Sequence, residues 1–223
     1  MRITVIGCGR WGGCLAWYLD RLGHEGTLYG RGGSEKLARF RSTRTNGLVT
    51  LPESVRLTTD LAGAVGTAEI LAISIGSQGF RGLMRQLAGL DLAGTTAVLC
   101  MKGLEAETGK RLTQIFGEYR PETPVAIWVG PGHVQDFVRG IPNCMVIDSE
   151  SMDVKKFLVG AFSGELIRFY YGSDLLGNEI GAASKNVIGI AAGMLDGLGK
   201  TALKGALMSR GTREIGRLIS AMG

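Results

Sequence analysis

Short apolar runs alternate with amphipathic segments along the chain as far as residue 171. Runs rich in Val, Ile and Leu predict buried strands, and apolar residues three or four positions apart predict helices between them. The expected strands cover 3–6, 24–29, 57–59, 69–75, 95–101, 124–129, 144–148 and 165–171. The helices include 77–90, with Ser77 as a plausible N-cap, and 108–119. This alternation predicts an α/β fold with a Rossmann-type doubly wound, mostly parallel sheet covered by helices on both faces.

The pattern changes after Gly172, where the strand signals stop and two helical segments, 174–198 and 201–222, follow. We therefore expect a sheet domain over residues 1–172 and an all-helical domain over residues 173–223. Two helices make a thin domain, so the sequence predicts that this second domain is partial and is completed by another chain or by further residues. Apolar helix faces left uncovered there would favour a homodimer.

Composition narrows the classes of function. The net charge of +5 comes without a long basic run, which suits a small anionic ligand better than nucleic acid. The four cysteines show no CxxC spacing and only two histidines are present, so we expect no metal site and buried thiols in a reducing, cytoplasmic compartment. The apolar stretch 175–198 contains Glu179, Lys185 and Asp196, which argues against a membrane span.

The glycine-rich segment Gly7-Cys8-Gly9-Arg10-Trp11-Gly12 follows the first strand and opens the first helix. It matches GxGxxG in the structural context that this dinucleotide-binding pattern requires. Gly7 is expected to permit a tight turn, Gly9 to let the backbone approach a pyrophosphate, and Gly12 to let helix and strand pack closely. Free N–H groups at the helix N-terminus would bind the anion, so residues 1–172 are predicted to bind a dinucleotide.

The end of the second strand bears on the choice of cofactor. An Asp or Glu there would bind the ribose of NAD, but the sequence reads Gly30-Arg31. An Arg can accommodate the 2′-phosphate of NADP, and Arg39, Arg41 and Arg44 would add positive field. The sequence therefore favours NADP over NAD, unless Arg31 is a solvated loop residue that tolerates either cofactor.

Two further segments follow strands at the edge where ligands bind. Lys102 comes directly after strand 95–101, and the carboxyl ends of parallel strands face the ligand crevice. The turn Gly130-Pro131-Gly132 follows strand 124–129 at the same edge. Its glycines would let the backbone approach a substrate or nicotinamide, although an ordinary strand–helix turn has the same composition.

Lys185 lies inside the apolar helix 174–198, among small and aliphatic neighbours. Such a lysine either extends to the surface along its aliphatic stem or has a pKa lowered for proton transfer. Asn186 beside it could orient a substrate. Spacing alone leaves both interpretations of Lys185 open.

Together, these segments resemble the bacterial NAD(P)-dependent glycerol-3-phosphate dehydrogenases, and the similarity extends over the whole chain. Two long strings carry most of it, Met-Lys-Gly-Leu-Glu-Ala-Glu-Thr-Gly at 101–109 and Ala-Ser-Lys-Asn-Val-Ile-Gly-Ile-Ala-Ala-Gly at 183–193. Further matches lie at 5–12, 28–31, 130–131 and 209–211.

The resemblance implies a reversible reaction in which dihydroxyacetone phosphate and NAD(P)H give sn-glycerol 3-phosphate, a glycerophospholipid precursor. It implies that Lys185 exchanges a proton with the C2 oxygen and that Lys102 is a second active-site lysine. The cofactor positions it implies are Arg10, Trp11, Arg31, Lys102 and Val134, and the substrate positions include Gly130 and Gly132. Hydride addition builds negative charge on the ketone oxygen, which a cationic Lys185 would stabilise. Lys102 nearby would lower the pKa of Lys185 from its reference value of about 10.4.

Two departures from the family pattern stand out. The family usually has Ser or Thr where Gly132 stands. Its members also continue beyond residue 223, with an Asp near the lysine and a Ser-Arg-Asn run that binds the substrate phosphate. On the present residues, phosphate recognition would fall to Lys102 and to Arg210, and a lysine does not readily replace a bidentate arginine.

Two alternatives remain open from the sequence. A β-hydroxyacid dehydrogenase or ketopantoate reductase would share the Rossmann domain, the helical domain and a catalytic lysine. A truncated chain could instead bind the dinucleotide without chemistry. The strings around the two lysines favour the glycerol-3-phosphate dehydrogenase.

Overall fold

The computed structural model describes residues 1–223 and contains one eight-stranded sheet. The strand order is β3-β2-β1-β4-β5-β6-β7-β8, and neighbours are parallel except for β6 and β7. This confirms the predicted Rossmann-type, mostly parallel sheet. The strands are β1 (Arg2–Ile6), β2 (Glu25–Tyr29), β3 (Arg56–Thr58), β4 (Ile70–Ile73), β5 (Thr96–Leu99), β6 (Val125–Val129), β7 (Asn143–Asp148) and β8 (Ile167–Tyr171).

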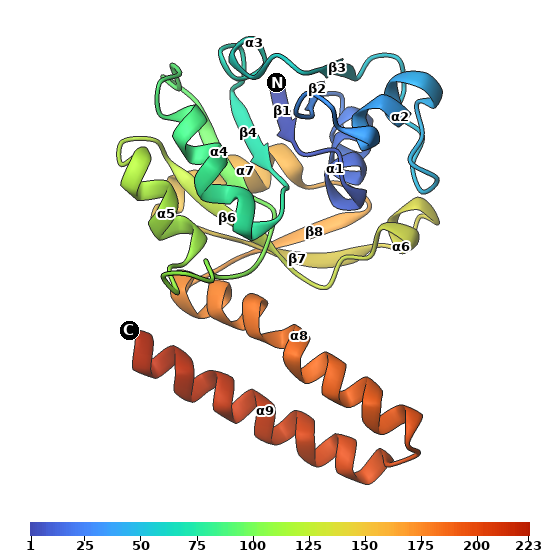
Figure 1. The fold of residues 1–223 in the computed structure, drawn as a ribbon, viewed down its shortest axis with the longest axis vertical. Helices are drawn as coiled ribbons and strands as arrows, with labels where there is room; N and C mark the ends of the chain where they lie inside the picture. Colours follow the sequence, from blue (N-terminus) through green and yellow to red (C-terminus); the bar gives the residue numbers. More distant parts are fainter.

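Helices cover both faces of this sheet (Figure 1). One face packs against α1 (Arg10–Arg21), α2 (Glu35–Thr43), α6 (Val134–Val138) and α7 (Met152–Phe162). The other packs against α3 (Leu61–Val65), α4 (Phe80–Leu87) and α5 (Leu112–Tyr119). Two separate apolar clusters result, because strands of a central parallel sheet are buried on both sides.

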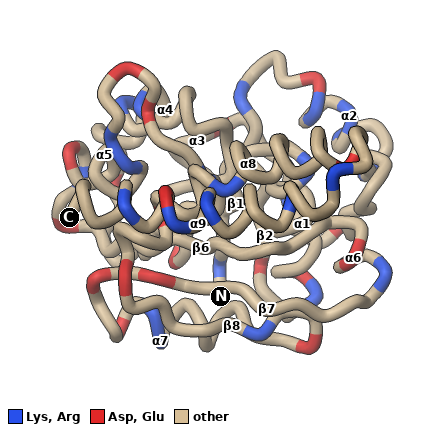
Figure 2. The backbone as a smooth tube through the Cα atoms, turned by 90° about the horizontal axis from the view of Figure 1, so that it is seen from below, with Lys and Arg blue, Asp and Glu red and all other residues tan.

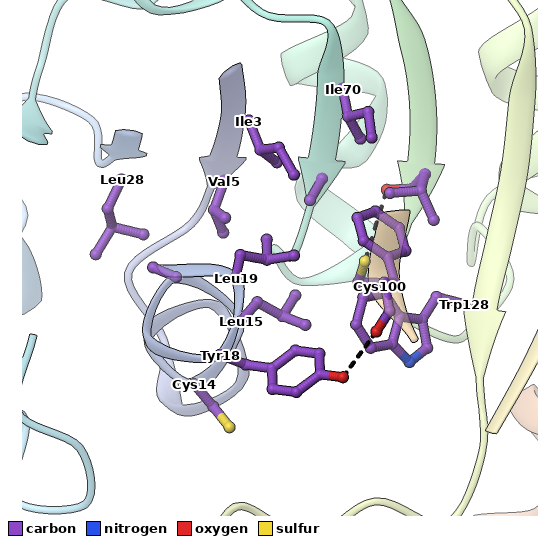
Figure 3. Packing of buried hydrophobic residues seen from close by; sticks show 14 of the residues in the cluster. Ile3, Val5, Cys14, Leu15, Tyr18, Leu19, Leu28, Ile70, Cys100 and Trp128 are labelled. Atoms are coloured by element: carbon purple, nitrogen blue, oxygen red, sulfur yellow. Dashed lines mark hydrogen bonds between the residues drawn. The ribbon is translucent and has the colours of Figure 1, made fainter. Parts of the chain in front are cut away.

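The packing of α1 on β1 illustrates how the core forms (Figure 3). Ile3 and Val5 point from β1 toward Leu15 and Leu19, and all four side chains are at most 1% exposed. Full burial of one such side chain contributes roughly 1.5–3 kcal/mol. The Tyr18 hydroxyl donates to the carbonyl oxygen of Phe162 at 2.7 Å, which ties α1 to the end of α7.

Three local expectations were wrong. Ser77 does not cap a long helix: a 3-10 turn, Ser77–Gly79, comes first, and Gly79 is the N-cap of α4. Helix α5 begins at Leu112 rather than at residue 108. Cys144 is exposed, whereas Cys8, Cys14 and Cys100 are buried as expected. Helix α2 was not foreseen; Ser34 caps it by accepting from the Leu37 N–H at 3.3 Å.

The last strand ends at Tyr171, and two long helices follow, α8 (Leu175–Gly197) and α9 (Thr201–Met222). They form an antiparallel hairpin that projects from the sheet (Figure 1). The helices touch closely at Gly211, where a Cβ atom would lie 2.4 Å from the Cδ1 of Ile188. Basic and acidic residues both occur along α9 (Figure 2). None of the helices has the length and apolar character that a membrane crossing requires.

Candidate active site

A cleft of about 1400 Å³ opens at the carboxyl ends of β1, β4, β5 and β6. Strand order reverses between β1 and β4, so the loops that follow these two strands diverge and leave a crevice. Each of the four strands contributes a lining residue directly after its end: Gly7, Ser74, Cys100 and Gly130, with Lys102 two positions after Cys100. The edge that the sequence singled out is therefore where the cleft lies.

The three glycines of the GxGxxG segment have different surroundings. Gly7 has φ +117°, and a Cβ atom there would lie 2.2 Å from the carbonyl oxygen of Ser74. A Cβ at Gly12 would lie 1.8 Å from the carbonyl oxygen of Gly7, so helix α1 contacts the turn through its backbone. A Cβ at Gly9 would meet nothing within 4 Å. The tight turn, the close packing and the open approach predicted for these positions are all present.

The N-terminus of α1 is free to bind an anion. Gly9 is its N-cap, no side chain accepts from the first N–H groups, and the first turn holds no acidic residue. An N-terminus of this kind attracts negative charge through unpaired N–H groups and the helix dipole. The loop and helix therefore fit the pyrophosphate of a dinucleotide.

The far end of the cleft, beyond β2, is mixed in charge. Arg31, Ser34 and Lys36 line it together with Glu35. None of Arg39, Arg41 and Arg44 lines the cleft, but the charge of Arg41 acts on the Cys8 thiol, which does line it, so the predicted positive field is supported for Arg41 alone. Arg44 instead fixes a neighbouring loop, donating to the carbonyl oxygen of Val55 at 2.9 Å and pairing with Glu53 at 3.6 Å.

Aromatic residues form the wall near β6. The Trp11 ring packs on Trp128 and Phe137 at centroid distances of 6.2 Å and 6.0 Å. Val134, which begins α6, is 6% exposed and lines the cleft. The absence of a side chain at position 132 has a steric reason, since a Cβ atom there would lie 2.8 Å from the Phe137 ring.

Lys102 and Lys185 reach the cleft from different elements, Lys102 from the loop after β5 and Lys185 from α8. Partial burial lowers the pKa of Lys102, and the charge of Lys185 and a hydrogen bond with it lower this pKa further. Two ammonium groups are thus held close enough to influence each other. We expected the pair to lower the pKa of Lys185; the structure instead shows a lowered pKa for Lys102.

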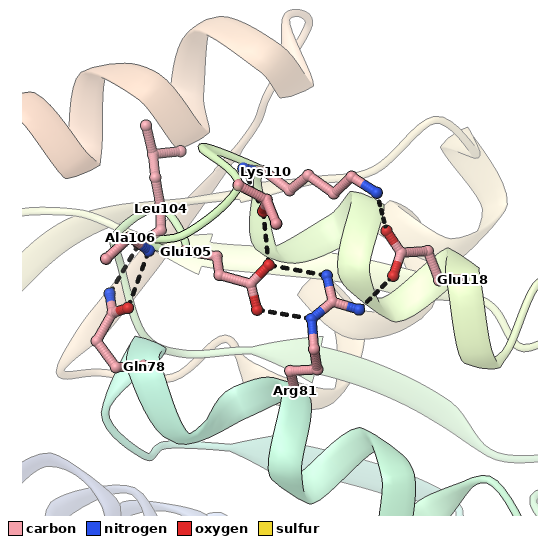
Figure 4. Close-up of polar contacts among 8 residues, drawn as sticks. Gln78, Arg81, Leu104, Glu105, Ala106, Lys110 and Glu118 are labelled. Carbon is pink, nitrogen blue, oxygen red and sulfur yellow. Dashed lines mark hydrogen bonds and ion pairs between the residues drawn. The ribbon is translucent and has the colours of Figure 1, made fainter.

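The string that follows Lys102 folds back on the segment after β4 (Figure 4). Arg81 forms a fork with the carboxylate of Glu105, at 2.6 Å from Nε and 2.8 Å from Nη2, and Thr108 donates to the same carboxylate at 2.5 Å. These donors hold the pKa of Glu105 down at about 2. Gln78 donates to the Leu104 carbonyl at 2.8 Å. The acidic and polar residues of this string therefore fix the loop that bears Lys102.

The predicted site residues separate into two groups. Those that line the cleft are Gly7, Gly9, Arg10, Trp11, Arg31, Lys102, Gly130, Gly132, Val134 and Lys185. Gly12 is buried behind the turn, where its packing role places it. Asn186 is exposed and does not line the cleft, so the geometry gives no support to substrate orientation by its side chain. Arg210 also lies outside the cleft and pairs with Glu214 at 3.6 Å.

Several lining residues were missed from the sequence. Ser74 and Ser77 follow β4 at the same edge as Lys102, so the strand-end rule that found Lys102 also applies to them. Lys36 and His133 carry no such signal. Lys36 lines the cleft because α2 begins beside it, and His133 because it is the N-cap of α6.

Comparison with known proteins agrees with this geometry. Residues 2–155 match the family model for the NAD-dependent glycerol-3-phosphate dehydrogenase N-terminus, and residues 174–223 match that for the C-terminus. The glycerol-3-phosphate dehydrogenase [NAD(P)+] of Thermoanaerobacter sp. (strain X514) is 37% identical, over all of this chain and 68% of its own length. The corresponding enzyme of Bradyrhizobium sp. (strain ORS 278) is 38% identical, over 99% of this chain and 68% of its own length.

A solved structure gives the same result. The crystal structure of glycerol-3-phosphate dehydrogenase from Coxiella burnetii superposes with a TM-score of 0.92 at 26% identity, covering 99% of this chain and 69% of that one. The chain thus spans about two thirds of the relatives it matches. With matches at both ends of the chain and over its fold, the protein belongs to the NAD-dependent glycerol-3-phosphate dehydrogenase family.

Proposed function

We propose that the protein catalyses the reversible NAD(P)H-dependent reduction of dihydroxyacetone phosphate to sn-glycerol 3-phosphate. One observation carries this proposal: two lysines converge on the cleft that begins at the dinucleotide-binding turn. A phosphorylated triose is anionic and a ketone, so it suits a cationic site beside a hydride donor. The names of the relatives and the expected role in glycerophospholipid precursor synthesis agree with this assignment.

In the proposed mechanism the nicotinamide supplies the hydride, and the protein supplies position and charge. Gly7, Gly9 and the N-terminus of α1 bind the pyrophosphate, and Trp11 and Val134 shape the wall near β6. Lys185, in its cationic form, stabilises the oxygen on which negative charge develops and transfers a proton to it. Lys102 adds a second positive charge for the substrate, and the backbone at Gly130 and Gly132 forms the adjacent wall.

We further propose that NADP(H) is the preferred cofactor. No carboxylate ends β2; Arg31, Ser34 and Lys36 line the cleft there instead. Two cations and a hydroxyl suit a 2′-phosphate better than a ribose diol. Glu35 in the same wall opposes this preference, so the Arg31 and Lys36 side chains would need to turn toward the phosphate.

The division of labour follows the change in architecture. We propose that residues 1–172 form the dinucleotide-binding domain and that residues 173–223, with Lys185, belong to the substrate domain.

We also propose that a second copy of the chain packs on the hairpin, forming a homodimer. An apolar strip along α8 supports this, since Val187, Ile190, Met194 and Leu198 are each at least 65% exposed. Sedimentation of wild type and Ile190→Glu tests it: only the wild type should dimerise.

The test of the reaction is a substrate comparison. We expect loss of NADPH absorbance with dihydroxyacetone phosphate, slower loss with NADH, and none with ketopantoate or other 2-keto acids. Turnover of the keto acids alone would favour the ketopantoate reductase alternative. Binding of NADPH without turnover of any triose phosphate would show a cofactor-binding chain that lacks the rest of its site.

A further inference from the structure

A buried carboxylate at the start of α8 makes its bonds outside that helix. The Glu179 side chain is 6% exposed. Its Oε2 accepts from Arg111 Nη1 at 2.6 Å and from the Thr113 hydroxyl at 2.5 Å, and its Oε1 accepts from the Thr113 N–H at 3.1 Å. The carboxylate therefore sits at the N-terminus of α5, where the helix dipole also favours negative charge.

The residues that Glu179 holds are the end of the loop that bears Lys102. Leu104 and Arg111 form an antiparallel bridge, and Glu105 donates its N–H to the Lys110 carbonyl at 3.0 Å. Residues 104–111 are thus a closed unit, with Lys102 two positions before it. Thr108 also bonds to Glu105 inside this unit, so we expect residues 104–111 to respond as one body to a change at Arg111, while Arg81 ties them to α4.

On the other side, Glu179 is rigidly connected to Lys185. Both belong to α8, six positions apart and thus less than two helical turns. Ala182, between them, lines the main cleft. A small cavity of about 10 Å³ is bordered by Lys102, Gly103, Glu179 and Ala182, so the carboxylate and the first lysine border the same space.

We propose that Glu179 is a positioning residue that sets the distance between Lys102 and Lys185. This inference rests on the proposed function. Two ammonium groups repel each other, and the loop and the helix that bear them come from separate parts of the chain. The ion pair of Glu179 with Arg111 and its hydrogen bonds from Thr113 hold these two parts together against that repulsion. Asn178, the preceding residue, anchors α8 elsewhere by donating to the Asp148 carboxylate at 2.7 Å.

Titration of Lys102 distinguishes a positioning role of Glu179 from a purely electrostatic one. Lys185 is the charged group that acts on Lys102, and Glu179, paired with Arg111, borders the same small cavity as Lys102. The other titratable groups lining the cleft are Cys8, Arg10, Tyr29, Arg31, Glu35, Lys36, Cys100 and His133. Loss of the Glu179 charge alone would not raise the pKa of Lys102, because a nearby anion favours the cationic form. Separation of the two lysines would raise it. A rise in this pKa therefore identifies separation.

The experiment compares wild type with Glu179→Gln, which keeps an oxygen acceptor but loses the charge. Lysines are labelled by reductive ¹³C-methylation, and the Lys102 resonance is assigned by its loss in Lys102→Arg. We expect the pKa of Lys102 to rise toward its ordinary value of 10.5 in Glu179→Gln. Since small misplacements of catalytic groups cost about 100-fold in rate, we expect a kcat loss of that order with the KM for NADPH unchanged.

Asn178→Ala is the matched control, because it removes an anchor of the same helical turn that points to β7. It should lower thermal stability and leave the pKa of Lys102 where it is. If Glu179→Gln does not fold, Thr113→Val removes one bond to Glu179 without changing any charge and should show a smaller rise. A pKa that stays or falls in these variants overturns the proposal. The titration needs no turnover, so an inactive wild type would contradict the proposed function and leave this test intact.

Discussion

Lys102 and Lys185 line one cleft, although Lys102 follows a strand of the sheet and Lys185 lies on the first helix beyond it. Partial burial and the nearby charge of Lys185 both lower the pKa of Lys102. An anionic substrate placed between them relieves this repulsion. The arrangement therefore favours a small phosphorylated ketone over a neutral one.

The two glycines of the dinucleotide turn should respond differently to the same substitution. Gly12→Ala places a Cβ atom 1.8 Å from a backbone oxygen, so we expect destabilisation of about 1–3 kcal/mol, the usual cost of overpacking. Gly9→Ala meets nothing in the protein, so it should keep wild-type stability and weaken cofactor binding. Thermal unfolding and fluorescence titration with NADPH measure the two effects. Equal stability of both variants would contradict this interpretation of the turn.

Cofactor preference should depend on Arg31 and Lys36. Removing one charge-assisted hydrogen bond costs about 1.5–3 kcal/mol, so Arg31→Ala should weaken NADPH binding at least about tenfold and leave NADH binding nearly unchanged. Lys36→Ala should act in the same direction. Arg39→Ala is the control, since Arg39 does not line the cleft. An equal loss of NADPH and NADH affinity would show that Arg31 stacks or packs without selecting the phosphate.

The Arg81–Glu105 fork predicts a particular response to acid (Figure 4). The pKa of Glu105 is held at about 2, below its ordinary value of 4.5. A carboxyl whose pKa is lowered on folding stabilises the protein above its unfolded pKa, and that contribution is lost as pH falls toward its folded pKa. The unfolding temperature of wild type should therefore fall between pH 4.5 and about 2 more steeply than that of Glu105→Gln. Parallel curves would contradict this role for the fork.

A second buried pair joins β7, α7 and the segment between β8 and α8. Lys155 lies 3.4 Å from the Asp148 carboxylate and donates to the Gly172 carbonyl at 2.7 Å, and both side chains are less than 9% exposed. Lys155→Met leaves a buried charge unpaired, which should destabilise the protein by about 3–5 kcal/mol in chemical denaturation. Adding Asp148→Leu should recover most of this loss. A Lys155→Met variant as stable as wild type would show that the ion pair contributes little.

Much of the fold could be predicted from the sequence, because its dominant signals are local. The apolar runs marked all eight strands, and the glycine spacing marked the dinucleotide turn in its strand–turn–helix context. Helix starts were less predictable where a side chain has a distant partner. Thr108 resembles the start of a helix, but its hydroxyl bonds to Glu105, and α5 begins only at Leu112.

The candidate site was predictable to the extent that strand ends identify it. Lys102 and the turn at Gly130 follow from the position of their strands. The bond of Glu179 to Arg111 and Thr113 joins segments far apart in the chain, and no local pattern indicates it. No local pattern indicates the contact of Phe137 with Gly132 either. The Phe137 ring fills the space beside Gly132, which explains why a glycine stands where the family usually has Ser or Thr.

We propose that Lys185 transfers the proton and stabilises the oxyanion. The decisive test of this role is single-turnover oxidation of bound NADPH with dihydroxyacetone phosphate, in wild type and in Lys185→Ala, with NADPH affinity measured alongside. General acid catalysis contributes typically about 10²–10⁴-fold, so we predict a rate loss in that range with cofactor affinity unchanged. A Lys185→Ala variant that oxidises NADPH at the wild-type rate would show that Lys185 is not the proton donor.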